Sequence, residues 1–146
     1  MSLHEMFKIA DIHATRIETA IKHTHQLFPI NPEAIKNIEE NDLAWVEFLV
    51  SRFAKLRDFL GGKIINEFLR LTGDLVENST MLDKINQLER LEIIEDAELW
   101  KEMRDVRNHI SHEYPDNPEL MAKYLNRIFD LAPKLLAFYY EIKKRS

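Results

Sequence analysis

Residues 41–73 decide the fold class of this chain, and they read NDLAWVEFLVSRFAKLRDFLGGKIINEFLRLTG. Apolar side chains recur in this stretch at steps of three and four residues, a spacing that places them on one face of a helix. They are Trp45, Phe48, Leu49, Phe53, Leu56, Leu60, Ile64, Ile65, Phe68, Leu69 and Leu71. Gly61 and Gly62 interrupt the pattern, because each glycine costs a helix roughly 1 kcal/mol relative to alanine. We therefore expect a kink or a close helix contact there, and a helix end at Gly73.

The segments on either side show the same helical spacing. They predict helices over residues 3–27, 79–91, 96–114 and 118–143, with prolines ending the first and third and Pro133 bending the last. The positions expected to face inward are Ile9, Ile12, Ile17, Ala20, Ile21, Leu82, Ile85, Leu88, Leu99, Trp100, Met103 and Val106. Because no alternating strand pattern occurs, the sequence predicts an all-α fold, an up-and-down bundle of four or five helices in one domain over residues 1–146.

The composition limits the function classes that are open to the chain. It has 146 residues and no cysteine, so disulfide frameworks, zinc–thiolate sites and thiol nucleophiles are excluded. No run of about 18 uncharged apolar residues and no signal-peptide pattern occurs, so we expect a cytoplasmic protein without membrane contact. The net charge of −5 argues against a general nucleic-acid binder.

The charge is distributed unevenly along the chain. Residues 77–98 carry 2 basic and 7 acidic side chains, whereas residues 99–146 carry 9 basic and 7 acidic ones. The acidic segment is typical of a solvated helix face, and a docking surface for a basic partner is the alternative. A local nucleic-acid site in the mildly basic final third stays compatible with the total charge.

The most informative stretch is residues 104–114, which read RDVRNHISHEY. On a helix, Asn108 and His112 lie one turn apart, and Arg107 and Tyr114 lie two turns apart. Four polar groups thus project over a broad sector near a helix end. This arrangement fits an ordinary solvated helix surface as well as a functional site.

Other kinds of site have weaker support. His109 and His112 have a spacing that could share a metal ion, but no third ligand is evident, so we expect no metal. A glycine-rich phosphate loop is absent from the sequence. The aromatic stripe along residues 45–59 is interpreted as core or dimer interface rather than as a base-stacking platform; it consists of Trp45, Phe48, Phe53 and Phe59.

Residues 107–114, RNHISHEY, fit the pattern R-N-x-x-x-H-x-Y. They resemble the R-x4-H-x-Y signature of HEPN domains, in the form found in the toxin partners of minimal nucleotidyltransferases. Such domains are all-α and carry the motif towards the end of the penultimate long helix. Residues 52–114 as a whole resemble these bacterial proteins, including FAKL at residues 53–56 and LERL at residues 88–91.

The resemblance implies a metal-independent endoribonuclease, the toxin of a toxin–antitoxin pair, that needs no cofactor. His112 would transfer a proton, because the ordinary pKa of histidine lies near neutrality. Arg107 would bind phosphoryl oxygens, since a guanidinium can hold two of them at once. Asn108 would orient the phosphate or His112, and Arg104 and His109 are secondary candidates.

The resemblance also implies partners. HEPN domains commonly pair two protomers, so we expect a homodimer whose two motifs line one cleft, with RNA and not DNA as substrate and a cognate minimal nucleotidyltransferase as antitoxin. In such toxins the motif tyrosine, here Tyr114, is the residue that the nucleotidyltransferase modifies with AMP. A packing role for Tyr114 at a helix end is the alternative. Two other functions stay open: a non-catalytic partner that binds a nucleotidyltransferase or presents nucleotides to it, and a helical scaffold dimer.

Overall fold

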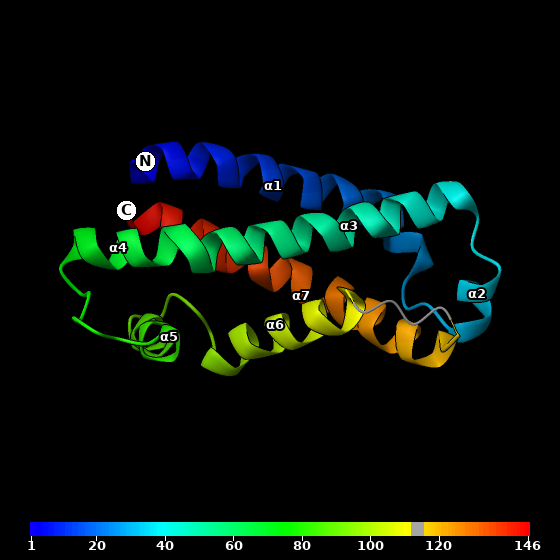
Figure 1. Cartoon of the computed structure of the whole chain (residues 1–146). Coiled ribbons are helices and arrows are strands. Elements are labelled where there is room, and N and C mark those ends of the chain that lie inside the picture. Colours follow the sequence, from blue (N-terminus) through cyan, green and yellow to red (C-terminus); the bar gives the residue numbers. More distant parts are fainter. Residues whose placement is uncertain (112–115) are drawn as a thin grey trace.

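The computed structural model describes residues 1–111 and 116–146, and all regular secondary structure in these residues is helical (Figure 1). The helices are α1 (Leu3–Thr24), α2 (Pro32–Lys36), α3 (Glu40–Phe59), α4 (Ile65–Thr72), α5 (Met81–Arg90), α6 (Ala97–Ser111) and α7 (Pro118–Arg145). A 3-10 turn (His25–Leu27) follows α1, and a π-helical turn (Leu60–Ile64) joins α3 to α4. The all-α prediction is confirmed, whereas the expected helix end at Pro115 falls outside the described residues.

Four rods form the bundle: α1, the continuous α3–α4 rod, α6 and α7 (Figure 1). They lie along one another and alternate in direction, so the two chain termini meet at the same end. α5 is seen end-on in this view and therefore crosses the rods instead of continuing the up-and-down order. With α3–α4 counted as one helix and the five-residue α2 left aside, the described residues form five helices, as many as the predicted four or five allow. None of these helices is long and apolar enough to cross a membrane.

Side-chain caps fix where several helices begin. The Thr80 hydroxyl accepts a hydrogen bond from the amide of Asp83 at 3.1 Å, and the Asp83 carboxylate accepts one from the amide of Thr80 at 3.0 Å. This capping box opens α5 at the expected place. Asn117 caps α7 and Asn31 caps α2, each followed by proline at the first helical position. The five-residue helix α2 is not among the expected elements, although residues 31–33 repeat the Asn-Pro-Glu start of residues 117–119.

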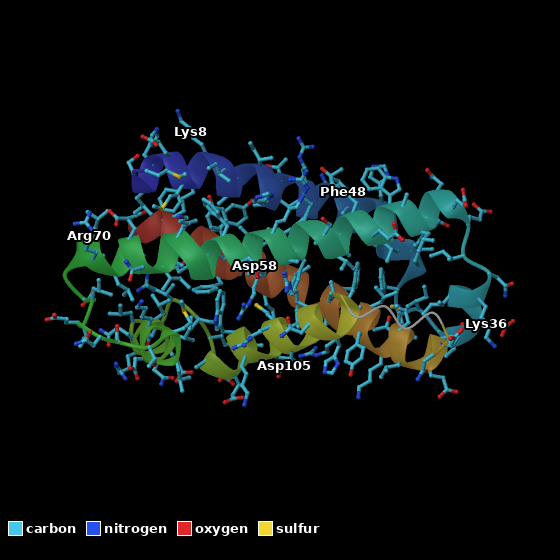
Figure 2. The ribbon with its side chains drawn as sticks, viewed as in Figure 1. Lys8, Lys36, Phe48, Asp58, Arg70 and Asp105 are labelled. Carbon is cyan, nitrogen blue, oxygen red and sulfur yellow. The ribbon has the colours of Figure 1, made fainter. Side chains whose placement is uncertain are left out.

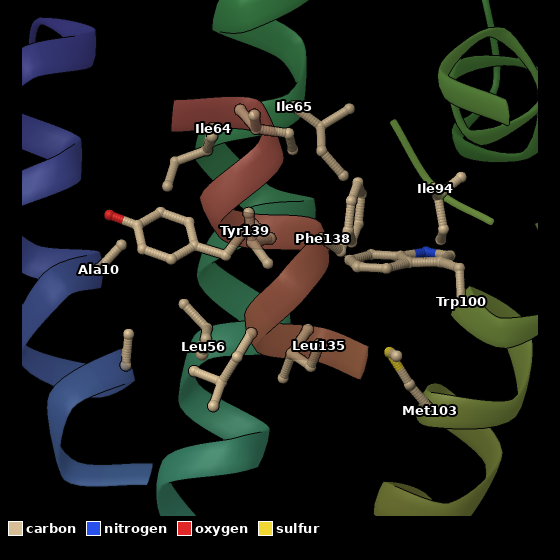
Figure 3. Packing of buried hydrophobic residues seen from close by; sticks show 14 of the residues in the cluster. Ala10, Leu56, Ile64, Ile65, Ile94, Trp100, Met103, Leu135, Phe138 and Tyr139 are labelled. Atoms are coloured by element: carbon tan, nitrogen blue, oxygen red, sulfur yellow. The ribbon is translucent and has the colours of Figure 1, made fainter. Parts of the chain in front are cut away.

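The core lies between α1, α3–α4, α6 and α7 (Figure 3). Ala10 of α1, Leu56 of α3 and Tyr139 of α7 are fully buried in it. Three residues expected to face inward are exposed instead: Ile12 by 50%, Leu71 by 57% and Leu82 by 64%. Leu71 lies in the last turn of α4 and Leu82 in the first turn of α5, so both stand at helix ends. Ile12 lies two residues from the buried Ala10 and Ala14, and its side chain therefore points to the opposite side of α1.

Polar contacts tie α7 to distant segments. The side chain of Asn126 accepts a hydrogen bond from the Ile30 amide at 2.7 Å and donates one to the Ile30 carbonyl at 2.9 Å. The buried Tyr139 donates its hydroxyl hydrogen towards Asp11 of α1, with an oxygen–oxygen distance of 2.6 Å. Lys143 forms an ion pair with the other carboxylate oxygen of Asp11 at 2.8 Å. The last helix is thereby fixed at both ends of the bundle.

Candidate functional site

The helix α6 buries one side against the bundle and leaves the motif residues at the border of that contact. Its buried positions recur at three-residue steps and are Trp100, Met103 and Val106. Arg107 follows Val106 directly, so its side chain is half-buried and 39% exposed. Because α6 also contacts α3, this position places the Arg107 guanidinium at the α3–α6 junction.

At that junction Arg107 forms an ion pair with Asp58 of α3. The distance from Nη2 of Arg107 to Oδ2 of Asp58 is 2.9 Å, and Nη1 of Arg107 lies 3.4 Å from Oδ1 of the adjacent Asn108. Asp58 is 48% exposed, so the pair is solvated and contributes about 0–1 kcal/mol to stability. Asp58 therefore orients the Arg107 guanidinium. Because the ion pair is weak, another anion can displace Asp58 from Arg107 at little cost in free energy.

Arg57 lies on the other side of Asp58, and its side chain is only 12% exposed. Nη1 of Arg57 is 4.0 Å from Oδ1 of Asp58, which places this carboxylate between two guanidinium groups. The pKa of Arg57 is lowered to about 10, chiefly by burial and also by the positive charges of Arg104 and Arg107, while Asp58 and Asp105 act in the opposite direction. The junction thus gathers three arginines around two aspartates and carries an excess of positive charge.

Trp100 contacts Arg57 through both its ring and its backbone carbonyl. The guanidinium carbon of Arg57 lies 4.0 Å from the centre of the Trp100 ring, and Nη2 donates a hydrogen bond to the Trp100 carbonyl at 3.3 Å. The ring also packs on Gly61 in the π-helical turn, where an added Cβ would lie 2.9 Å from Trp100 Cζ2. Of the two features expected at the glycine pair, a kink or a close helix contact, the structure has the close contact, between Gly61 and Trp100 of α6. Gly62 has no neighbour within 4 Å of the position of an added Cβ.

The structure separates the two secondary candidates from each other. Arg104 is exposed on α6 and belongs to the positive cluster at the α3–α6 junction, as its influence on Arg57 indicates. His109 instead stacks on Tyr124 of α7, with ring centres 4.5 Å apart and an interplanar angle of 5°. His109 is thereby placed beside α7, and Arg107 beside α3.

Two of the predicted functional residues, His112 and Tyr114, lie outside the described residues. The described part of the motif therefore supplies the cations and amide that could bind a phosphate. Within residues 1–111 and 116–146 no group of three or more His, Asp or Glu side chains has the arrangement of a metal site. Two pockets of about 300 Å³ lie elsewhere, one around the α4–α5 loop and one between α6 and α7, and neither is lined by Arg104, Arg107 or Asn108.

Arg57 and Asp58 are not among the residues expected from the sequence to form the site. A signal for Arg57 was nevertheless present, because it lies one turn from both Phe53 and Gly61 and thus places a cation next to the apolar face of its helix. Cations at such positions are rarely buried unless a partner meets them. Asp58 gives no comparable signal, since an exposed acid on a helix is ordinary.

Comparison with protein-family models, with curated proteins and with solved structures finds no match to this chain.

Proposed function

We propose that this chain is a metal-independent endoribonuclease of the HEPN type, the cytoplasmic toxin of a toxin–antitoxin pair. The observation that carries the proposal is the Arg107 guanidinium at the α3–α6 junction, held by Asp58 within a cluster of three arginines. Such a cluster is suited to a phosphodiester, because guanidinium groups bind phosphoryl oxygens through paired N–H donors. The resemblance of residues 107–114 to the R-x4-H-x-Y signature adds His112 as the group that transfers the proton.

In the proposed reaction the ribose 2′-oxygen forms a bond to the adjacent phosphorus, and the bond from phosphorus to the 5′-oxygen breaks. His112 takes the proton of the 2′-hydroxyl, and a protonated histidine donates one to the departing 5′-oxygen. The products are a 2′,3′-cyclic phosphate and a 5′-hydroxyl. Arg107 stabilises the negative charge that accumulates on the phosphoryl oxygens.

Asp58 positions Arg107 until a phosphate replaces it. The exposed ion pair is weak, so exchange of the carboxylate for a phosphodiester costs little. After the exchange Asp58 still lies beside Arg57, whose buried positive charge can retain it. Replacement of the carboxylate by an amide in Asp58→Asn removes a negative charge next to the substrate, so we expect a several-fold lower KM with little change in kcat.

The proposal includes a homodimer, because two motifs in one cleft would supply one histidine as base and the other as acid. It also includes control by a cognate minimal nucleotidyltransferase that transfers AMP to Tyr114. An added phosphate next to Arg107 would occupy the guanidinium that the substrate needs. RNA is the proposed substrate, and no metal or cofactor takes part.

The test is RNA cleavage in EDTA by purified protein that mass spectrometry shows to be free of AMP. We expect cleavage that leaves cyclic phosphate ends, and a loss of roughly 100-fold or more in both Arg107→Ala and His112→Ala. Lys101→Ala is the matched control, since it removes an exposed positive charge from the same helix outside the motif. An inactive AMP-free wild type, or equal losses in all three variants, would contradict the proposal.

A second function is favoured by the same ion pair. Because Asp58 of α3 already pairs with Arg107 of α6, the junction would join these two helices in a non-catalytic partner that binds a nucleotidyltransferase or presents nucleotides to it. In that case Arg107→Ala would weaken binding to the nucleotidyltransferase, and no variant would affect RNA.

A further inference from the structure

A cluster of positive charge lies at the border between α1 and α3. Arg16 of α1 and Arg52 and Lys55 of α3 all lower the pKa of His13, adding to the larger effect of burial. The ion pairs found among the described residues involve none of these three cations. Three neighbouring positive charges are thus available to an anion from outside the chain.

Aromatic rings continue this border towards the start of α3. The Arg52 guanidinium lies over the ring of Phe48, 5.4 Å from its centre. Trp45, one turn earlier, meets Phe48 edge-on at 5.7 Å and stacks in parallel on the exposed His23 of α1, with ring centres 3.8 Å apart and an interplanar angle of 3°. Figure 2 shows Phe48 at the border of α1 and α3. Cations and rings therefore follow one another along a single seam. Of the aromatic stripe interpreted from the sequence as core or dimer interface, Phe53 is in the core, whereas Trp45 and Phe48 are only half-buried and belong to this seam.

Arg52 is held in a fixed orientation at the centre of this seam. Its Nη1 donates a hydrogen bond to Nδ1 of His13 at 3.0 Å, which requires an unprotonated nitrogen on the histidine ring. The lowered pKa of His13 keeps that nitrogen unprotonated at neutral pH. A guanidinium that is already oriented loses less entropy when it binds a ligand.

We propose that this α1–α3 seam is a binding surface for single-stranded RNA, formed by the cations Arg16, Arg52 and Lys55 and the rings of His23, Trp45 and Phe48. Positive groups that contact the backbone, interleaved with rings on which bases stack, are what single-stranded nucleic acid requires. The choice of RNA as the ligand rests on the proposed function. The new element is the surface on which the RNA strand binds.

The seam leads directly to the candidate site. Lys55 lies one turn from Asp58, the residue that holds Arg107, so both share the exposed side of α3. Figure 2 shows Phe48 and Asp58 on the same helix. From Trp45 to Asp58 the helix rises roughly 20 Å at 1.5 Å per residue, a length that accommodates several nucleotides. A strand bound along the seam would bring a later phosphate to Arg107.

A second copy of the chain is a poorer occupant of this surface. Closed dimers are usually twofold, and a twofold interface places a patch against its own copy. Arg16, Arg52 and Lys55 would then lie close to three identical cations, and like charges brought together at an interface oppose association. A polyanion has the complementary charge, and the adjoining rings favour one with exposed bases.

The test measures binding of an unstructured RNA of about 12 nucleotides to the Arg107→Ala protein, so that cleavage does not interfere. In this background the triple variant R16Q/R52Q/K55Q is compared with the charge-matched K8Q/K36Q/K144Q. We expect the first to weaken binding at least tenfold and to reduce the slope of log affinity against log salt by about 2, or about 0.7 for each lost phosphate contact. Equal effects of the two triple variants would overturn the inference.

His23→Ala examines the stacking contribution separately, because this side chain is exposed and its removal spares the core. We expect roughly fivefold or greater weakening with an unchanged salt slope. Duplex RNA of the same sequence that binds as tightly as the single strand, or an acidic peptide that displaces RNA at lower concentration, would also overturn the inference. If the wild type cleaves RNA and R16Q/R52Q/K55Q does not change RNA binding, the seam is rejected and the proposed nuclease stands. If R16Q/R52Q/K55Q weakens RNA binding but the wild type does not cleave RNA, the proposed nuclease is rejected and the seam stands.

Discussion

Replacement of Gly61 by alanine tests the contact that supports the candidate site. The added methyl carbon would lie 2.9 Å from Cζ2 of Trp100, closer than a real Cβ approaches another heavy atom, and 3.4 Å from Cη2. Trp100 is 6% exposed and its ring meets Phe138 edge-on at 5.8 Å, so it has little room to retreat. Figure 3 shows the two rings in contact in the core. Gly61→Ala must therefore displace either the ring or the π-helical turn.

The expected magnitude follows from two opposing contributions. Overpacking of a dense core by one methyl group costs about 1–3 kcal/mol. Removal of a glycine from a helical segment restores up to about 1 kcal/mol through a less flexible unfolded chain. The free energy of unfolding of Gly61→Ala should consequently fall by about 0–3 kcal/mol.

Gly62→Ala provides the matched control. The same methyl group meets nothing within 4 Å at position 62, so only the helix-forming benefit applies, and we expect about 0.5–1 kcal/mol of added stability. Urea unfolding followed by circular dichroism measures both variants with one wild-type reference. The two alanine variants should differ by about 1–3 kcal/mol.

A double-mutant cycle shows whether Trp100 is the cause of the difference. Trp100→Phe removes the outer part of the indole, including the atoms that the new methyl group would meet. In that background Gly61→Ala should cost at least about 1 kcal/mol less than in the wild type. Equal stability of Gly61→Ala and Gly62→Ala, or an unchanged cost of Gly61→Ala beside Phe at position 100, would refute the reasoning.

Three further predictions concern the contacts that hold the bundle. Asn126→Ala leaves the buried amide and carbonyl of Ile30 without their partners and should lower the free energy of unfolding by about 1–3 kcal/mol; an unchanged urea midpoint would contradict this. Tyr139→Phe removes the hydroxyl that binds Asp11 and should cost about 1–2 kcal/mol by the same measurement, so full stability would mean that the hydrogen bond has no net value. The pKa of His13 is lower in the folded than in the unfolded chain, so its contribution to stability is present above pH 6.5 and is lost as the pH falls below that value. His13→Gln should therefore lose less thermal stability than the wild type between pH 7.5 and pH 5, and identical losses would exclude this assignment.

The principal helices follow from the sequence because their signals are local. The capping box of Thr80 and Asp83 and the start at Asn117 depend on side chains within one turn, and both appear where the residue types predict them. The residues that face the core are less predictable, because the burial of a side chain depends on which other helices pack against it. Leu82 lies three residues before the buried Ile85 and is nevertheless exposed at the start of α5, whereas Ile12 faces away from the buried Ala10 and Ala14.

The candidate site is predictable only as far as it lies on one helix. Arg107 and Asn108 are adjacent in the chain, and their hydrogen bond needs no tertiary information. The partner Asp58 is 49 residues away, and it meets Arg107 where α6 packs on α3, near the close approach of Trp100 to Gly61. Periodicity predicts which face a residue occupies, but the crossing of two helices depends on such long-range contacts.

The net charge of −5 would oppose RNA binding if all charges of the protein acted on the RNA equally, whatever their distance from it. Salt limits its reach, because interactions between exposed charges decay over about 8 Å at physiological ionic strength. The acidic segment, residues 77–98, contains α5, which lies on the other side of the α3–α4 rod from α1 (Figure 1). A helix with its side chains is about 10 Å across. A strand on the α1–α3 seam would therefore experience Arg16, Arg52 and Lys55 more strongly than the acids of residues 77–98. Neutralising those acids should change RNA affinity much less than removing the three cations, and a larger effect of the acids would place the bound strand elsewhere.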